Sequence, residues 1–187
     1  MNVKVAQVAA GVSVHTVICT AEGRVWTFGN GEYGQLGHVG NATEMVPRIV
    51  EGLMDVKVAQ VAAGYFHTVI CTAEGRGWTF GSGEYGQLGH GVAANEIMPR
   101  IMEGLMDVKV AQVAAGGGHT VICTAEGRVL AFGVDVDRSL WPKLVPYVES
   151  EDFVGNSEEE EGDDSEIEEI SGDGSEDEGD EGVDGES

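Results

Sequence analysis

Short runs of apolar and β-branched residues, each ended by glycine, divide the first three quarters of the chain into strand-length segments. In the middle of the chain these runs predict strands over residues 58–62, 68–72, 77–80 and 99–102. Glu74-Gly75 lies between the second and third runs and predicts a hairpin turn there. The second run is continuously apolar over 69–71 and does not alternate, which is typical of a strand covered on both faces.

The same pattern occurs three times at a fixed period. His15, His67 and His119 recur every 52 residues, and so do three cysteines and three strand-ending glycines. The copies cover residues 1–53, 54–105 and 106–148; the third is shortened and lacks the phrase Tyr-Gly-Gln-Leu-Gly-His. Four antiparallel strands per unit of about 50 residues are typical of a propeller blade. We therefore predict an all-β fold, a partial β-propeller of about three four-stranded blades.

Residues 149–187 differ sharply from the repeats in charge. They hold 20 acidic residues and no Lys or Arg, which leaves 13 acidic and 10 basic residues before them. So acidic a segment with few apolar residues cannot offset its ordering entropy, and we predict a disordered acidic tail. The repeats have no stripe of basic residues along which a phosphate backbone could bind, so direct nucleic-acid binding is not expected. The acidic tail has the charge to attract basic partners, such as basic chromatin proteins.

The repeat also has a specific sequence signature. Residues 64–68 fit the pattern G-x-x-H-[ST], residues 78–81 read Trp-Thr-Phe-Gly, and residues 85–89 read Tyr-Gly-Gln-Leu-Gly. Neither the Trp-Asp strand of WD40 repeats nor the glycine doublet of Kelch repeats is present. The combination resembles the regulator of chromosome condensation repeat family over about 148 residues. The resemblance implies a β-propeller, which in this family usually has seven blades.

The resemblance implies three kinds of function. The leading hypothesis is a non-catalytic protein–protein interaction module, hence no enzyme. The first alternative is guanine-nucleotide exchange on a Ran-like small GTPase, the activity of the family's founding member, although these copies lack its wedge-like insertion. The second is a fragment of a repeat-containing ubiquitin ligase. The family's plant ultraviolet-B photoreceptor uses Trp before the repeated His. At these positions this chain has Val12-Ser13-Val14, Tyr65-Phe66 and Gly117-Gly118, so light sensing by that route is not expected.

Loop residues are the candidate partner-binding site. Propeller loops are the usual contact surface, and the long loop of each of the first two copies holds an acidic residue followed by a tyrosine. These candidates are Glu32, Tyr33, Glu84 and Tyr85. In the tail, Ser157, Ser165 and Ser175 each precede an acidic residue by three positions, which suits an acidophilic kinase; the alternative is a tail that only aids solubility.

The repeated histidines and cysteines could suggest a metal site. Matched positions of adjacent blades are usually far apart, however, and we favour histidines bonded to backbone and buried thiols. Trp26 and Trp78 hold a position that is Leu130 in the third copy. Since leucine can replace them, we favour a role in hydrophobic packing over an aromatic platform on which a ligand stacks. We expect no metal and no cofactor.

The remaining features concern compartment and assembly. The N-terminus has no secretory pattern, no apolar window is long enough to cross a membrane, and the three cysteines form no CxxC pair, so we expect an intracellular protein, cytoplasmic or nuclear. Three blades are too few for the family's closed ring and leave open blade edges. Two explanations stay open: a truncated product, or assembly with a copy of itself or with another propeller segment.

Overall fold

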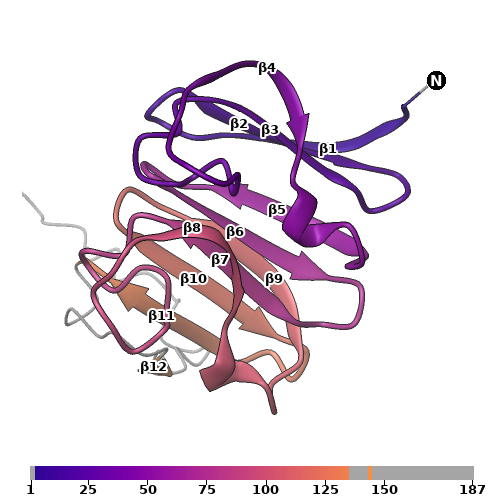
Figure 1. Cartoon of the computed structure of the whole chain (residues 1–187). Coiled ribbons are helices and arrows are strands. Elements are labelled where there is room, and N and C mark those ends of the chain that lie inside the picture. Colours follow the sequence, from indigo (N-terminus) through magenta and orange to yellow (C-terminus); the bar gives the residue numbers. More distant parts are fainter. Residues whose placement is uncertain (1–2, 135–142, 145–187) are drawn as a thin grey trace, which may run out of the picture. The chain divides into compact units, whose positions relative to one another are not determined.

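The computed structural model describes residues 3–134 and 143–144, which form three four-stranded antiparallel sheets (Figure 1). We call these sheets blades 1, 2 and 3. Blade 1 consists of β1 (Val5–Ala10), β2 (His15–Thr20), β3 (Val25–Gly29) and β4 (Glu44–Ile49). Blade 2 consists of β5 (Val58–Ala63), β6 (His67–Thr72), β7 (Gly77–Gly81) and β8 (Glu96–Ile101). Blade 3 consists of β9 (Val110–Ala115), β10 (His119–Thr124), β11 (Val129–Gly133) and β12 (Lys143–Leu144). The predicted all-β partial propeller is confirmed.

Each blade is an up-and-down meander in which neighbours in sequence pair in space. The predicted hairpin between β6 and β7 turns at Gly75, which has a positive φ of 81°. The fourth strand of blade 2 differs from the prediction, because β8 begins at Glu96 and holds Pro99 in its interior. Pro99 is tolerated there because β8 is the outermost strand of its sheet and has an unpaired edge. Single 3₁₀ turns, η1 (Glu51–Leu53) and η2 (Glu103–Leu105), lead into the next blade.

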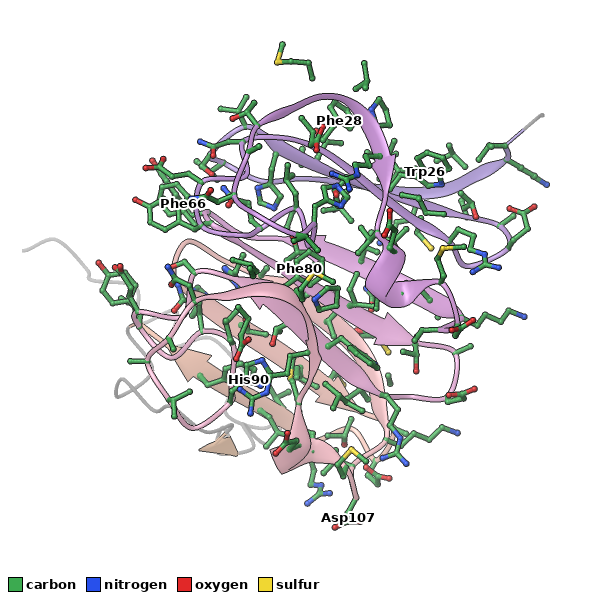
Figure 2. All side chains as sticks on the ribbon, in the orientation of Figure 1. Trp26, Phe28, Phe66, Phe80, His90 and Asp107 are labelled. Carbon is green, nitrogen blue, oxygen red and sulfur yellow. The ribbon has the colours of Figure 1, made fainter. Side chains whose placement is uncertain are left out.

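The core lies between the blades, not within them. One apolar cluster joins Val17, Cys19 and Val25 of blade 1 to the face of blade 2 that includes Ile70 and Phe80. A second cluster joins blades 2 and 3 in the same way, with Ile122 and Phe132 on the blade 3 side. Figure 2 shows Phe80 between the ribbons of its own blade and blade 1. Burial on both sides explains why β6 is apolar without alternation.

The inner strands are also joined through glutamine side chains. Nε2 of Gln7 donates to the Val61 carbonyl at 3.2 Å, and the Val61 N–H donates to Oε1 of Gln7 at 3.0 Å. At the next junction the Val113 N–H donates to Oε1 of Gln60 at 2.9 Å. A repeated glutamine thus fixes each inner strand on the one that follows it.

The outer faces of blades 1 and 3 carry the same residues, and no described strand packs over them. On blade 1, Val5 is 48% and Val8 is 58% exposed, whereas their blade 2 counterparts Val58 and Val61 are 4% and 2% exposed. On blade 3, Val129 is 37% exposed, whereas Val25 at the matching position is 1% exposed. We call these surfaces the leading face of blade 1 (Val5, Val8, Ile18 and Phe28) and the trailing face of blade 3 (Val121, Cys123 and Val129).

The described part of the chain holds no helix with the length and apolarity that crossing a membrane requires.

Candidate functional site

The long loop between β7 and β8 is a folded platform held from inside its blade. The hydroxyl of Thr79 donates to the Leu88 carbonyl at 2.7 Å and lies 3.0 Å from Nε2 of His90. Because the hydroxyl proton goes to Leu88, His90 is the donor in the second bond. Burial lowers the pKa of His90, with the positive charge of Arg100 acting in the same direction. Blade 1 repeats this arrangement with Thr27, Leu36 and His38.

Glycines shape this loop where a side chain would not fit. Gly89 has a φ of 70°, and a Cβ at that position would lie 2.8 Å from the Phe132 ring of blade 3. The Gln87 side chain accepts from the Tyr85 N–H at 2.9 Å and so fixes the backbone at Tyr85. The loop therefore presents Tyr85 from a rigid base, packed on the neighbouring blade.

A cleft of about 490 Å³ opens at the junction of blades 2 and 3, beside this loop. Its lining is mainly aromatic and small, with one acidic side chain and no Lys or Arg among the described residues. Tyr65 and Tyr85 on its walls are 42% and 48% exposed. The cleft is lined by Tyr33, Tyr65, Phe66, Ser82, Glu84, Tyr85, Gln87, Gly117, Gly118 and Val134.

Three of the four predicted loop residues line this cleft: Tyr33, Glu84 and Tyr85. Glu32 is exposed on the same loop as Tyr33 but is not part of the lining. The candidate phosphorylation sites Ser157, Ser165 and Ser175 lie outside the described residues.

The prediction missed the wall that precedes the repeated histidines. Tyr65 and Phe66 come directly before β6, and Gly117 and Gly118 come directly before β10. The ring of Phe66 lies 4.5 Å from that of Tyr33 and 4.4 Å from that of Tyr65, between centroids. Figure 2 shows Phe66 at one edge of the stacked sheets. The available signal was that these positions vary between the copies while the His and Thr that follow them do not.

The repeated histidines connect blades. Nε2 of His15 lies 3.2 Å from the hydroxyl oxygen of Thr68 in blade 2, and that hydroxyl donates to the Gln35 carbonyl of blade 1 at 2.8 Å. His67 and Thr120 repeat the bond at 3.0 Å, with Gln87 as the acceptor at 2.7 Å. Since each hydroxyl proton goes to a glutamine carbonyl, Nε2 of each histidine carries the proton. The sequence did not predict this side-chain partner, a threonine of the next blade.

Burial keeps these histidines neutral. It lowers the pKa of His15 to about 4, a shift that the backbone of His67 partly opposes. It lowers the pKa of His67 to about 3, with His15 and His119 acting in the same direction. Nδ1 of each of the two rings is buried without a hydrogen-bond partner among the described residues. Each ring lies against a glycine: a Cβ at Gly64 would lie 2.3 Å from Cε1 of His67.

The repeated histidines and cysteines, considered above as metal ligands, make contacts between blades. No group of three or more potential ligand side chains is found among residues 3–134. The thiols of Cys19 and Cys71 are buried, and each approaches a carbonyl of the following blade, those of Val58 and Val110. Trp78 and Leu130 pack against the two interblade clusters.

Comparison with known proteins gives two family matches. The model of the regulator of chromosome condensation (RCC1) repeat matches residues 22–71 and 74–123, and a second model of the same description matches residues 5–35 and 58–87. Among curated proteins, the chain is 37% identical over 131 residues to the human E3 ubiquitin-protein ligase HERC2. That match covers 69% of this chain and 3% of HERC2.

Two solved structures are similar to the fold. The crystal structure of human WBSCR16 matches with a TM-score of 0.71 and 29% identity, over 78% of this chain and 39% of that one. The crystal structure of Prp20p from Saccharomyces cerevisiae, a protein described with its binding to Gsp1p and histones, matches with a TM-score of 0.65 and 23% identity. That match covers 79% of this chain and 40% of Prp20p. The chain thus spans only a small part of HERC2 and about two fifths of these two structures.

Proposed function

The chain belongs to the regulator of chromosome condensation repeat family, and from that premise we propose that it is a non-catalytic protein-interaction module. The observation that carries the proposal is the aromatic cleft at the junction of blades 2 and 3. Exposed tyrosines on a rigid base are typical of protein-binding surfaces, because they bury a large area and lose little side-chain entropy. Among the described residues that line the cleft, none forms an arrangement of nucleophile and base.

The partner that fits this surface is a basic protein segment. Glu84 is the charged side chain of the lining, and Glu32 stands exposed on the neighbouring loop. The sequence after residue 148 adds 20 acidic residues. Prp20p, described as binding histones and Gsp1p, supports two candidate partners for this chain: histones and a Ran-like small GTPase. We place histones first because their charge complements both the cleft and the acidic segment.

Direct titration tests this proposal. The full chain would be immobilised and exposed to purified core histones at two salt concentrations. We expect saturable binding that weakens with salt and that falls at least about tenfold in a Tyr85→Ala, Glu84→Gln double variant. The matched control is Met45→Ala, which changes an exposed side chain on β4 of blade 1. Binding that the double variant leaves unchanged would contradict a role for the cleft.

Exchange on a small GTPase is the alternative activity. Release of a fluorescent nucleotide from a Ran-like GTPase would be followed with and without the chain. We expect release at the intrinsic rate, and a large acceleration would replace the interaction-module proposal by exchange activity. Membership in a larger ubiquitin ligase is the other alternative, supported by HERC2, and a longer transcript encoding a catalytic domain would establish it.

Self-association is a second proposed interaction, favoured by the two uncovered faces. The leading face of blade 1 and the trailing face of blade 3 carry the residues that pack against each other twice inside the chain. A second copy, placed head to tail, would repeat that contact, with His119 of one copy facing Thr16 of the other. Two copies would give six blades, within the usual range of four to eight.

Solution mass tests this head-to-tail contact. We expect a species of twice the chain mass of 19.7 kDa in light scattering, and its dissociation on dilution. Val8→Lys on the leading face should abolish it, whereas Val46→Lys, exposed on β4, should not. A monomer at all concentrations would contradict the proposal.

We infer an intracellular location, cytoplasmic or nuclear, which the three unpaired cysteines support. We infer phosphorylation of Ser157, Ser165 and Ser175, which an acidophilic kinase assay with site mapping by mass spectrometry would test.

A further inference from the structure

We propose that the cleft binds an aromatic side chain of the partner, inserted where blade 3 lacks the phenylalanine that blade 2 provides. This inference rests on the proposed interaction function and names the chemistry of the ligand. The repeat builds two junctions in the same way, and they differ at the position of Phe66.

At the junction of blades 1 and 2, the chain fills the position itself. Phe66 precedes β6 and packs its ring on Tyr33, with 4.5 Å between centroids and an angle of 47° between ring planes. Offset and tilted ring pairs of this kind are favourable beyond the area that they bury. The loop tyrosine of blade 1 therefore has an aromatic partner within the chain.

At the junction of blades 2 and 3, no side chain of the described residues takes the place of Phe66. Tyr85 is the counterpart of Tyr33, and Gly118 is the counterpart of Phe66, each 52 residues further along. The backbone follows the same course, because the Ser82 N–H donates to the Phe66 carbonyl and the Val134 N–H to the Gly118 carbonyl, both at 2.8 Å. A Cβ at Gly118 would lie between two side chains, 3.2 Å from Cγ2 of Val134 and 3.5 Å from Cδ2 of Tyr85. A side chain at Gly118 would thus extend toward Tyr85, as that of Phe66 extends toward Tyr33.

The cleft contains that position. Gly118, Tyr85, Val134 and Phe66 all belong to its lining. Its volume of about 490 Å³ leaves room for a ring and the residue beside it. Glu84 is the lining's charged group, so the ligand that fits is a Phe, Tyr or Trp next to Lys or Arg.

Short peptides test this chemistry without a whole partner. The amides of acetylated Phe-Arg, Leu-Arg and Ala-Arg would be titrated into the full chain and followed by NMR of the tyrosine rings. We expect Phe-Arg to shift the Tyr85 resonances with millimolar affinity, and Ala-Arg to bind about tenfold more weakly or not at all. Equal binding of all three peptides would overturn the aromatic specificity and leave the arginine as the ligand.

Gly118→Phe is the decisive variant, because it gives blade 3 the residue that blade 2 has. After a small shift of the Val134 side chain, the new ring should occupy the cleft and abolish the Phe-Arg shifts. Val39→Phe is the matched control, since it adds a ring at a position that is 80% exposed in blade 1. Undiminished binding by a folded Gly118→Phe variant would overturn the proposal.

A second variant covers the case in which the added ring prevents folding. Tyr85→Ala removes one wall, and it should bring the affinity for Phe-Arg down to that for Ala-Arg. Its failure to do so would overturn the proposal. Histone binding without any preference for Phe-Arg would refute this inference alone, whereas loss of histone binding with the Phe-Arg preference intact would refute only the histone partner.

Discussion

The junction between blades 1 and 2 and the two outer faces present the same residues in opposite surroundings. Val58 and Val61 are buried against blade 1, while Val5 and Val8 hold the same positions in blade 1 and are about half exposed. His15 bonds to a threonine of the next blade, while His119 is only half-buried. The same repeat sequence therefore forms a buried core where another blade packs against it and an exposed surface where none of the described blades does. Stability in this fold belongs to the junctions, as expected for repeat proteins.

The largest difference is expected for the repeated phenylalanine. Phe80 is fully buried at the junction, and Phe80→Ala should cost about 3–5 kcal/mol of unfolding free energy because it leaves a cavity. Phe28 is its half-buried counterpart on the leading face, and Phe28→Ala should lower the unfolding free energy by roughly 1–2 kcal/mol. Denaturant unfolding of both variants would measure this. Equal costs would mean that the junction adds no stability, or that a second copy covers Phe28.

The threonine that joins the blades gives the next largest difference. Thr68→Val keeps the shape but leaves Nε2 of His15 and the Gln35 carbonyl without their partner, at a cost of roughly 2–4 kcal/mol. Thr16 is half-buried on the leading face, and in the monomer at high dilution Thr16→Val should change stability by less than about 0.5 kcal/mol. Thermal or urea unfolding would compare the pair. A Thr68→Val variant as stable as the parent would contradict the hydrogen-bond chain described above.

Acid should weaken the junctions through their histidines. Burial lowers the pKa of His15 to about 4 and that of His67 to about 3, so both are neutral when folded. The unfolded chain takes up protons below about pH 6.5, so stability present at neutral pH is lost as the pH falls from there toward the folded pKa values. Each histidine should contribute a slope that rises to about 1.4 kcal/mol per pH unit once its unfolded form is fully protonated, near pH 5. Unfolding free energies between pH 7 and pH 5 should show this slope, and His67→Gln should reduce it by about one histidine's share.

The smallest effect concerns thiol reactivity rather than stability. Cys19 and Cys71 are buried and burial raises the pKa of their thiols, whereas Cys123 on the trailing face is half-buried. In the folded protein, iodoacetamide should therefore modify Cys123 first. Peptide mapping would identify the labelled residue. Faster labelling of Cys71 would contradict the closed junction, and protection of Cys123 at high concentration would support the head-to-tail contact.

Much of the fold could be predicted from the sequence because local signals repeat. The strand-length runs, the turn at Glu74-Gly75 and the period of 52 residues each indicate a blade without any distant contact. The start of β8 could not be predicted in this way, since it depends on pairing with β7: Gly81 lies opposite Glu96. The loop tyrosines were found as candidates, but the wall that faces them was not, because Phe66 and Gly118 belong to segments far from Tyr33 and Tyr85 in sequence.

The sequence by itself determined the blade, its repetition and the family, because these depend on residues close together in the chain. Only the tertiary structure decided which residues of each copy are buried and which residues of the next copy they contact. It assigned the histidines to threonines of the following blade, because only stacking brings residues 53 apart in sequence into hydrogen-bond distance. It also placed Gly118 opposite Tyr85, where a missing side chain becomes a cleft. In this repeat protein the contacts between copies, rather than the copies themselves, separate a packed junction from an open cleft.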